Sequence, residues 1–182
     1  MTLRSDKMLL HICCGPCSIY PVSVLRQEGV ELLGFFTNRN VHPFTEAKRR
    51  EDTLRTYADS IRLPVLYPEG YDVEGFFRSA AFHESERCRL CYEHRLKEAA
   101  RAALAHGCGS FTTTLLYSKF QKHDVIAQVG ADVGKALGVH FHYRDFREGW
   151  KKGVEESKRL GMYRQQYCGC LYSEKERYIP RS

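Results

Sequence analysis

Seven of the eight cysteines stand in three short groups, and cysteine is the residue type best suited to hold a soft metal or move electrons. The groups are Cys13-Cys14-Gly15-Pro16-Cys17, Cys88-Arg89-Leu90-Cys91 and Cys168-Gly169-Cys170. A free cysteine also packs as a small buried hydrophobe. Three cysteines within five residues, followed by two more groups, argue against simple packing and indicate metal or redox chemistry. Cys108 stands alone and is expected to be a core residue.

The second group suits a metal because of its spacing. Cys88 and Cys91 lie three residues apart in a helical pattern, so they share one helix face. With two cysteines of the first group they supply four thiolates, which by count fit zinc or an iron–sulfur cluster. Zinc ribbons use two Cys-x-x-Cys turns, whereas here one pair is adjacent and the other is helical. This geometry favours iron–sulfur over zinc.

Two patterns also indicate thiol redox chemistry. Cys14-Gly15-Pro16-Cys17 has the spacing of a thioredoxin-type dithiol at a helix start, but that interpretation leaves Cys13, Cys88 and Cys91 without a role. Cys168 and Cys170, separated by one glycine, can close a small strained disulfide that accepts two electrons. The alternative for this pair is two more metal ligands.

Histidines and threonines are secondary candidates. His11 lies next to the first group and has the best case among the candidate metal or acid groups His11, His42, His83, His94 and His123, although a single histidine is more often structural. Thr112, Thr113 and Thr114 are either strand formers or hydrogen-bonding groups for a substrate. The first turn lacks the Ser/Gly loop that cradles phosphates, so use of ATP is not expected.

The elements that must hold these residues alternate between strand and helix. Apolar runs predict strands at residues 8–12, 30–37, 65–67, 110–115 and 139–146, and Asn38 ends the second. Helical patterns occupy residues 16–27, 43–61, 71–81, 84–106, 124–137 and, as the last helix, 149–160; residues 165–173 are a loop or helix start. The order predicts an α/β fold, a parallel sheet of about five strands with helices on both faces. Ligands of such sheets bind at the carboxyl ends of the strands, where the first cysteine group, Asn38 and the three threonines fall.

Composition bounds the class of protein. The 182 residues, 43% hydrophobic and 27% charged, suffice for one domain with a full core. Residues 1–7 lack the apolar segment of a secretory signal, and no apolar run is long enough to span a membrane. A cytoplasmic location with reduced thiols is therefore expected.

The charge distribution favours a nucleic-acid partner. The net charge is +6, and basic residues gather at Lys48-Arg49-Arg50 and through the last forty residues, from about 144 to 182, where tyrosines and Trp150 are interleaved with them. Cations beside aromatic rings suit a phosphate backbone and unstacked bases. A modest charge excess also fits a solvated surface without such a partner.

The motifs together resemble one protein family. The three cysteine groups, with His11-Ile12 before the first, Thr112-Thr113-Thr114-Leu115-Leu116 between them and Leu171-Tyr172-Ser173 after the last, follow the order found in the QueH family of epoxyqueuosine reductases. The match spans nearly the whole chain. The resemblance implies a Rossmann-like fold similar to that of adenine-nucleotide α-hydrolases. It also implies reductive removal of the epoxide oxygen from epoxyqueuosine in the anticodon arm of tRNA, without cobalamin.

The resemblance further implies roles for individual cysteines. Cys13, Cys14, Cys88 and Cys91 would hold a [4Fe-4S] cluster, and Cys17 is the candidate ligand of an additional iron ion beside it. Cys168 and Cys170 would form a redox-active pair, supplied by an electron donor that the sequence does not identify. The expected organisation is one iron–sulfur reductase domain over residues 1–182, whose basic C-terminal part, from about 144, carries this pair.

Two other function classes stay open on the sequence. One is a non-catalytic, zinc-stabilised RNA-binding domain, which leaves Cys168 and Cys170 without a task. The other is a thiol–disulfide oxidoreductase, which needs no metal. Iron and sulfide content separates the iron–sulfur reductase from both alternatives.

Overall fold

The computed structural model describes residues 7–37 and 40–179, in which one sheet of parallel strands has the order β3-β2-β1-β4-β5. The strands are β1 (Lys7–Ile12), β2 (Glu31–Phe36), β3 (Val65–Leu66), β4 (Ser110–Thr113) and β5 (His140–Phe141). The central strand is β1, and its Leu9, Leu10 and Ile12 are fully buried. The expected α/β fold with about five parallel strands is confirmed.

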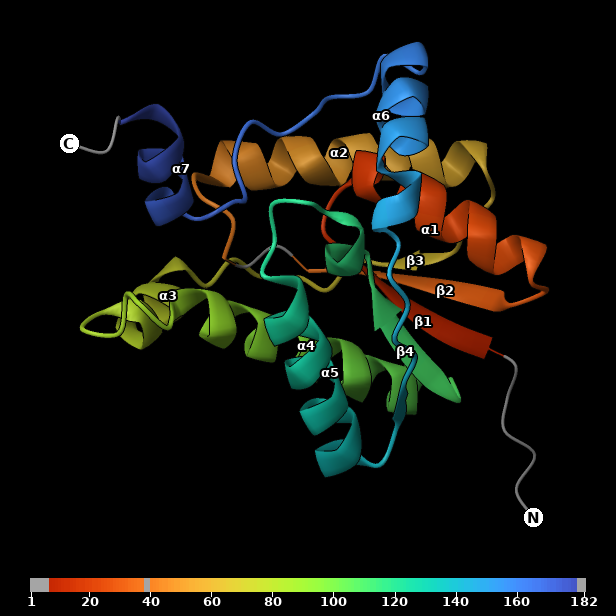
Figure 1. Cartoon of the computed structure of the whole chain (residues 1–182), viewed down its shortest axis with the longest axis horizontal. Coiled ribbons are helices and arrows are strands. Elements are labelled where there is room, and N and C mark those ends of the chain that lie inside the picture. The colour runs from red at the N-terminus through yellow and green to blue at the C-terminus, as the bar shows by residue number, and fades with distance from the viewer. Residues whose placement is uncertain (1–6, 38–39, 180–182) are drawn as a thin grey trace.

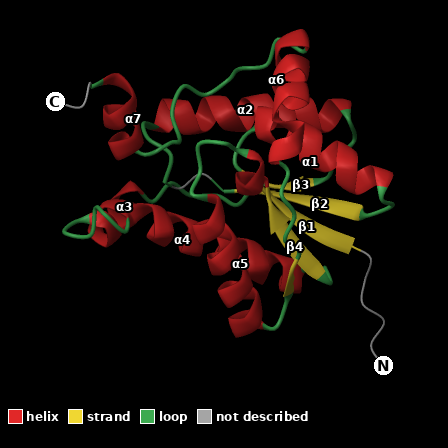
Figure 2. Ribbon diagram, in the orientation of Figure 1, coloured by secondary structure: helices red, strands yellow, loops and turns green. Residues whose placement is uncertain are grey.

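Helices cover both faces of the sheet (Figure 1, Figure 2). The helices α1 (Gly15–Gln27), α2 (Phe44–Ser60) and α6 (Trp150–Arg159) lie on one side, and α3 (Val73–Ala80), α4 (Arg87–Ala105) and α5 (His123–Leu137) on the other. The last helix, α7 (Leu171–Tyr178), lies near the start of α2. Because strand order reverses between β1 and β4, the carboxyl ends of these two strands form the switch point at which such folds bind ligands.

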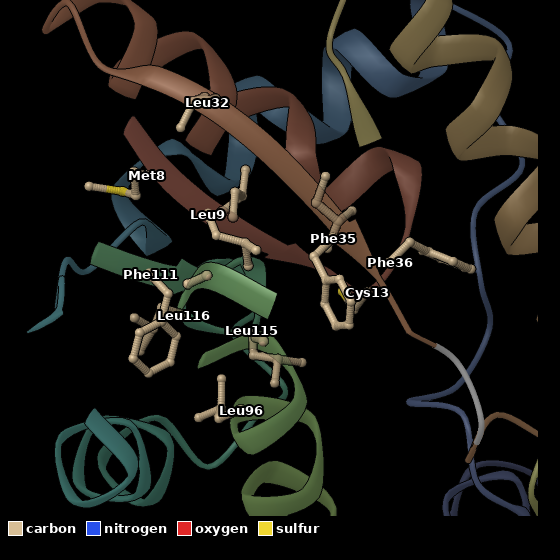
Figure 3. Close-up of a cluster of buried hydrophobic side chains, with 14 of the residues drawn as sticks. Met8, Leu9, Cys13, Leu32, Phe35, Phe36, Leu96, Phe111, Leu115 and Leu116 are labelled. Atoms are coloured by element: carbon tan, nitrogen blue, oxygen red, sulfur yellow. The ribbon is translucent and has the colours of Figure 1, made fainter. Parts of the chain in front are cut away.

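The core that supports this switch point is apolar on both sides of the sheet. Figure 3 shows Leu9 from β1, Phe111 from β4 and Leu96 from α4 among the side chains of one buried cluster, to which Cys13 also belongs. Each fully buried side chain of this kind contributes about 1.5–3 kcal/mol. The close packing of this core therefore holds the end of β1, and with it the turn that carries Cys13 and Cys14, in a fixed position.

Three sequence expectations differ from the observed elements. The fourth strand ends at Thr113, not at residue 115, because the Thr113 hydroxyl accepts the Leu115 N–H at 3.1 Å and starts the 3₁₀ helix η1 (Thr114–Tyr117). The fifth strand is two residues long instead of spanning 139–146: only His140 and Phe141 pair with β4, opposite Ser110 and Phe111. The helix expected to be the last is followed by α7, so residues 165–173 are a loop that leads into a helix.

Some expectations concern residues outside the described part of the chain. These are residues 1–6, Asn38 as the end of the second strand, and Arg181 in the basic C-terminal part. Among the helices within residues 7–37 and 40–179, none combines the length and apolar character needed to cross a bilayer.

Candidate active site at the carboxyl edge of the sheet

The first cysteine group lies where β1 passes into α1. The sulfur atoms of Cys13, Cys14 and Cys17 all lie within 4.8 Å of one another, and those of Cys13 and Cys14 are 3.9 Å apart. The three residues are buried, and all eight cysteines are free thiols. Within the described ranges, no other set of three His, Cys, Asp or Glu side chains comes this close together. The group fits a metal site.

Local sequence brings these thiols to the start of a helix. Gly15 lies close to its neighbours, because a Cβ there would come within 2.8 Å of Met162 Cε and 3.2 Å of Thr53 Cγ2. Pro16 stands in the first turn of α1, where its missing N–H costs no hydrogen bond. The unpaired N–H groups and the dipole of this helix end favour negative charge on the sulfurs beside it.

Hydrogen bonds concentrate that negative charge on one sulfur. The thiols of Cys14 and Cys17 hold the pKa of Cys13 well below its usual value. The Thr114 hydroxyl approaches the Cys13 sulfur at 3.3 Å and accepts the Cys13 N–H at 3.1 Å. Burial raises the pKa of Cys14. Three buried cysteines, one of them with a lowered pKa, form a soft donor set, and such sets suit iron or zinc.

His11 lies next to this group as a neutral imidazole. It is fully buried, and burial, helped by the positive charge of Arg95, lowers its pKa to about 3. Its Nδ1 atom lies 2.8 Å from Thr113 Oγ1, while Nε2 has no partner in the described part of the chain. The buried Thr113 at the end of β4 and Thr114 at the start of η1 thus hydrogen-bond His11 and Cys13. The remaining candidate histidines are either buried away from this group or exposed: His42, His123, His83 and His94.

The second cysteine group reaches the same edge from the opposite face. Cys88 and Cys91 lie in the first two turns of α4, which runs antiparallel to the strands and therefore starts at their carboxyl ends. Both are half-buried, and burial raises the pKa of Cys88. Asn40 donates from Nδ2 to the Cys91 sulfur at 2.8 Å and accepts from Arg95 Nε at 2.9 Å. These two cysteines stand outside the three-sulfur group, so the four expected cluster ligands form two pairs.

A cavity of about 180 Å³ opens beside Cys91. Polar side chains, Asn40 and Glu98 among them, line it together with the ring of Phe76. Thr37 donates to Glu98 at 2.8 Å and so fixes one carboxylate oxygen in the wall. The lining combines an aromatic face with hydrogen-bonding groups, which is the mixture that recognises a nucleobase.

The third cysteine group faces the second. Cys168 and Cys170 stand in the loop before α7, and Gln121 donates from Nε2 to the Cys168 sulfur at 3.1 Å. Although solvent reaches Cys168, the protein around its thiol raises the pKa to about 11, first by desolvation and then through the charge of Cys91. Charge on Cys170 in turn raises the pKa of Cys88. The chain thus returns after more than seventy residues to bring these four thiols into one neighbourhood.

Two buried arginines at this edge were missed by sequence reasoning. Arg50 on α2 is 2% exposed and Arg95 on α4 is 6% exposed. The assignment of Arg50 to a basic cluster for nucleic acid was wrong, because its guanidinium is enclosed by protein. The helical periodicity of α2 could have indicated that Arg50 is buried, because Arg50 lies on the same buried face as Ala47, Leu54 and Ala58.

Much of the basic C-terminal part is neutralised locally. Arg144 pairs with Glu28, Arg147 with Asp145 and Arg159 with Glu156. Lys151 and Lys152 at the start of α6 are exposed. Near them the ring of Phe120, 85% exposed, lies 5.5 Å from that of Trp150. Exposed lysines next to an exposed aromatic ring are suited to a single-stranded nucleic acid.

Comparison with known proteins agrees with these features. The family model described as epoxyqueuosine reductase QueH matches residues 8–176. Proteins of that name from Dehalococcoides mccartyi and Thermotoga maritima are 33% and 32% identical to the chain, covering 96% and 93% of it and 96% and 91% of their own lengths. A third, from Acinetobacter baylyi, is 34% identical over 93% of the chain and 81% of its own length.

Proposed function

This chain belongs to the QueH family of epoxyqueuosine reductases, and we propose on that premise that it converts epoxyqueuosine in the tRNA anticodon loop to queuosine. The reaction consumes two electrons and two protons, replaces the epoxide by a carbon–carbon double bond and releases the oxygen as water. It needs no cobalamin. The observation that carries the proposal is the buried group of Cys13, Cys14 and Cys17 at the switch point, within a family match over most of the chain.

The proposed cofactors are a [4Fe-4S] cluster and an additional iron ion. We assign Cys13, Cys14, Cys88 and Cys91 to the cluster, because two elements bring them to one sheet edge and thiolates are its usual ligands. Cys17 is assigned to the additional iron. When bound, such a cluster supplies single electrons, and an iron with an open position supplies a Lewis acid for the epoxide oxygen. In the competing assignment Cys17 binds the cluster in place of Cys88 or Cys91, because the Cys17 sulfur is close to those of Cys13 and Cys14.

The chain's own residues prepare the site for this chemistry. Thr114 hydrogen-bonds Cys13, and the buried His11, neutral because burial lowers its pKa, lies next to the group and bonds Thr113. Side-chain amides donate to sulfur at Cys91, Cys168 and Cys17, from Asn40, Gln121 and Gln165 respectively. Donors of this kind stabilise negative charge on a thiolate, which tunes a bound cluster. The cavity beside Cys91 is the proposed receptor for the modified base.

Cys168 and Cys170 are proposed to form the redox-active pair. Closing their disulfide releases two electrons and two protons, the number that one deoxygenation requires. Their position next to Cys88 and Cys91 supports transfer toward the cluster ligands. In this scheme the chain works as one reductase domain, and its basic C-terminal part carries the pair and contributes to tRNA binding.

Anaerobic purification followed by iron, sulfide and zinc analysis tests the proposal. Wild type should contain iron and acid-labile sulfide, and Cys88→Ser should lose both because one cluster ligand is gone. Cys17→Ser should lose only the additional iron and keep the sulfide. Cys108→Ala is the matched control, since this buried cysteine lies at the amino end of β4 and should not change metal content.

The outcomes separate the function classes. Zinc in place of iron, with no sulfide, would support the zinc-stabilised RNA-binding domain instead. A metal-free protein that still reduces protein disulfides would be a thiol oxidoreductase. Unchanged iron and sulfide in Cys88→Ser would remove Cys88 from the ligand set.

A further inference from the structure

Arg50 is buried beneath the loop that carries Cys168 and Cys170. Its Nη1 donates to the carbonyl oxygen of Cys168 at 2.8 Å and its Nη2 to that of Tyr167 at 3.0 Å. The third donor, Nε, binds Glu46 Oε1 at 2.7 Å, one turn back on the same helix. One side chain on α2 thus holds a loop that lies more than a hundred residues further along the chain.

The same loop is fixed at a third consecutive carbonyl. The backbone N–H of His42 donates to Gly169 O at 2.7 Å. Gly169 itself has φ of +152°, and a Cβ there would lie 3.0 Å from Val41 Cγ2 and 3.3 Å from Arg50 Nη1. Three successive carbonyls therefore meet donors from α2 and the segment before it, and a side chain on the residue between the two cysteines would press against Val41 and Arg50.

The charge of Arg50 is balanced inside the protein. Glu46 is buried as well, and its second carboxylate oxygen accepts the Tyr163 hydroxyl at 2.5 Å. Arg50 also lies near enough to Cys14 for its positive charge to oppose the effect of burial on that thiol. A guanidinium can bind two carbonyls and a carboxylate at once because its donors form a rigid planar fork, which lysine lacks.

We propose that Arg50 is a positioning residue that holds the backbone of residues 167–169 in the conformation of the open dithiol and thereby sets the thiol–disulfide equilibrium of Cys168 and Cys170. The proposal rests on the proposed redox role of this pair. Ring closure between residues two apart must turn the backbone at Gly169, whose carbonyl is held by the His42 N–H and whose neighbouring carbonyl, of Cys168, is held by Arg50. The pinned loop therefore opposes closure and keeps the pair reduced.

Equilibrium with a dithiol reductant of known potential measures this effect. Reduced dithiothreitol gives two electrons and two protons to the protein disulfide; it becomes its cyclic disulfide, and the protein gains two thiols. Purified holoprotein is equilibrated anaerobically at graded ratios of the two forms, quenched in acid and alkylated. Both cysteines fall in the tryptic peptide of residues 165–175, so mass spectrometry reports this pair separately from the other six cysteines.

Arg50→Lys should shift the equilibrium at least tenfold toward the disulfide, equivalent to a potential about 30 mV more negative. The matched control is Arg55→Lys, since Arg55 also pairs with a glutamate four residues earlier but is 47% exposed and lies outside the loop contacts. It should stay within twofold of wild type. Iron content should be equal in all three proteins, because Arg50 contacts no proposed cluster ligand directly.

The outcomes distinguish this inference from the function it rests on. An Arg50→Lys protein that retains iron and whose thiol–disulfide equilibrium constant stays within twofold of the wild-type value would overturn the positioning role alone. A wild-type pair that forms no disulfide at any ratio would overturn both the redox role and the positioning role. If Arg50→Lys does not fold, Glu46→Gln carries the test, with an expected shift of threefold or more against a Glu51→Gln control.

Discussion

Replacing Arg50 with Met removes the cation from an enclosed ion pair and leaves its partner behind. Glu46 would keep only the Tyr163 hydroxyl, at a side chain that is 8% exposed, and the carbonyls of Tyr167 and Cys168 would lose charged donors. Breaking a buried pair on one side typically costs about 3–5 kcal/mol, because the remaining charge is uncompensated. We expect a loss in this range, a large share of the total of about 5–15 kcal/mol for a domain.

Urea unfolding of metal-matched, reduced protein measures the loss. With a slope of about 2 kcal/mol per molar urea, 4 kcal/mol lowers the unfolding midpoint by about 2 M. Arg55→Met is the control, and its exposed pair with Glu51 and its contact with the Tyr67 ring at 3.7 Å should cost about 1 kcal/mol. Adding Glu46→Leu to Arg50→Met should recover part of the loss, because no buried charge is then left alone.

The reasoning fails if Arg50→Met and Arg55→Met unfold at the same urea concentration. It also fails if Glu46→Leu and Arg50→Met add without coupling, since independence would mean that the two charges do not depend on each other in the folded protein. Either result would indicate that water reaches the Arg50 guanidinium.

Three further predictions concern the surface and the response to pH. The double variant Lys151→Glu, Lys152→Glu should bind tRNA more weakly at low salt and with a weaker salt dependence, measured by filter binding, and should keep its iron content. If the affinity of the variant and of wild type falls with salt concentration at the same rate, the surface around Lys151 and Lys152 does not bind tRNA. Phe120→Ala should weaken tRNA binding by about 1–3 kcal/mol if a base stacks on it, whereas Phe82→Ala, which is also largely exposed in the turn after α3, should not. Burial lowers the pKa of His42, so the unfolded state binds more protons and stability should fall as pH drops below about 6.5, by up to about 1.4 kcal/mol per pH unit. Urea midpoints between pH 7.5 and 5.5 should fall less in His42→Leu, and identical falls would contradict the assignment.

The sheet could be predicted because its signals are local. An apolar run such as residues 8–12 is buried whatever its neighbours are, and alternation with helices then dictates parallel strands. The ends of the fourth and fifth strands could not be predicted from local signals. The fourth ends because the Thr113 hydroxyl starts a 3₁₀ helix instead of continuing the strand. The fifth pairs with it at His140 and Phe141 only, although its pattern continues further.

The cysteine groups differ in the same way: the contacts within one turn could be predicted from sequence, and those between distant segments could not. Cys13, Cys14 and Cys17 lie within one turn, so their sequence spacing alone brings the sulfurs together. The approach of Cys168 to Cys91 depends on the path of the chain after α6, and sequence gives no periodicity for a loop. Only a family resemblance joins these residues before the fold is known.

Arg50 illustrates why residue type misleads at such a site. Three adjacent cations, as in Lys48-Arg49-Arg50, suggest that all three side chains are exposed to solvent. A helix turns 100° per residue, however, so the three side chains point in different directions. The third falls on the stripe of Ala47 and Leu54, where an uncharged side chain is the usual choice. A charge retained at a core position must be compensated, and here the Glu46 carboxylate and the carbonyls of Tyr167 and Cys168 compensate Arg50. Burying an ion pair such as Arg50–Glu46 carries a desolvation cost, and packed apolar residues of similar volume are often at least as stable. The presence of this pair under the Cys168–Cys170 loop is therefore better explained by control of the loop conformation than by its contribution to stability.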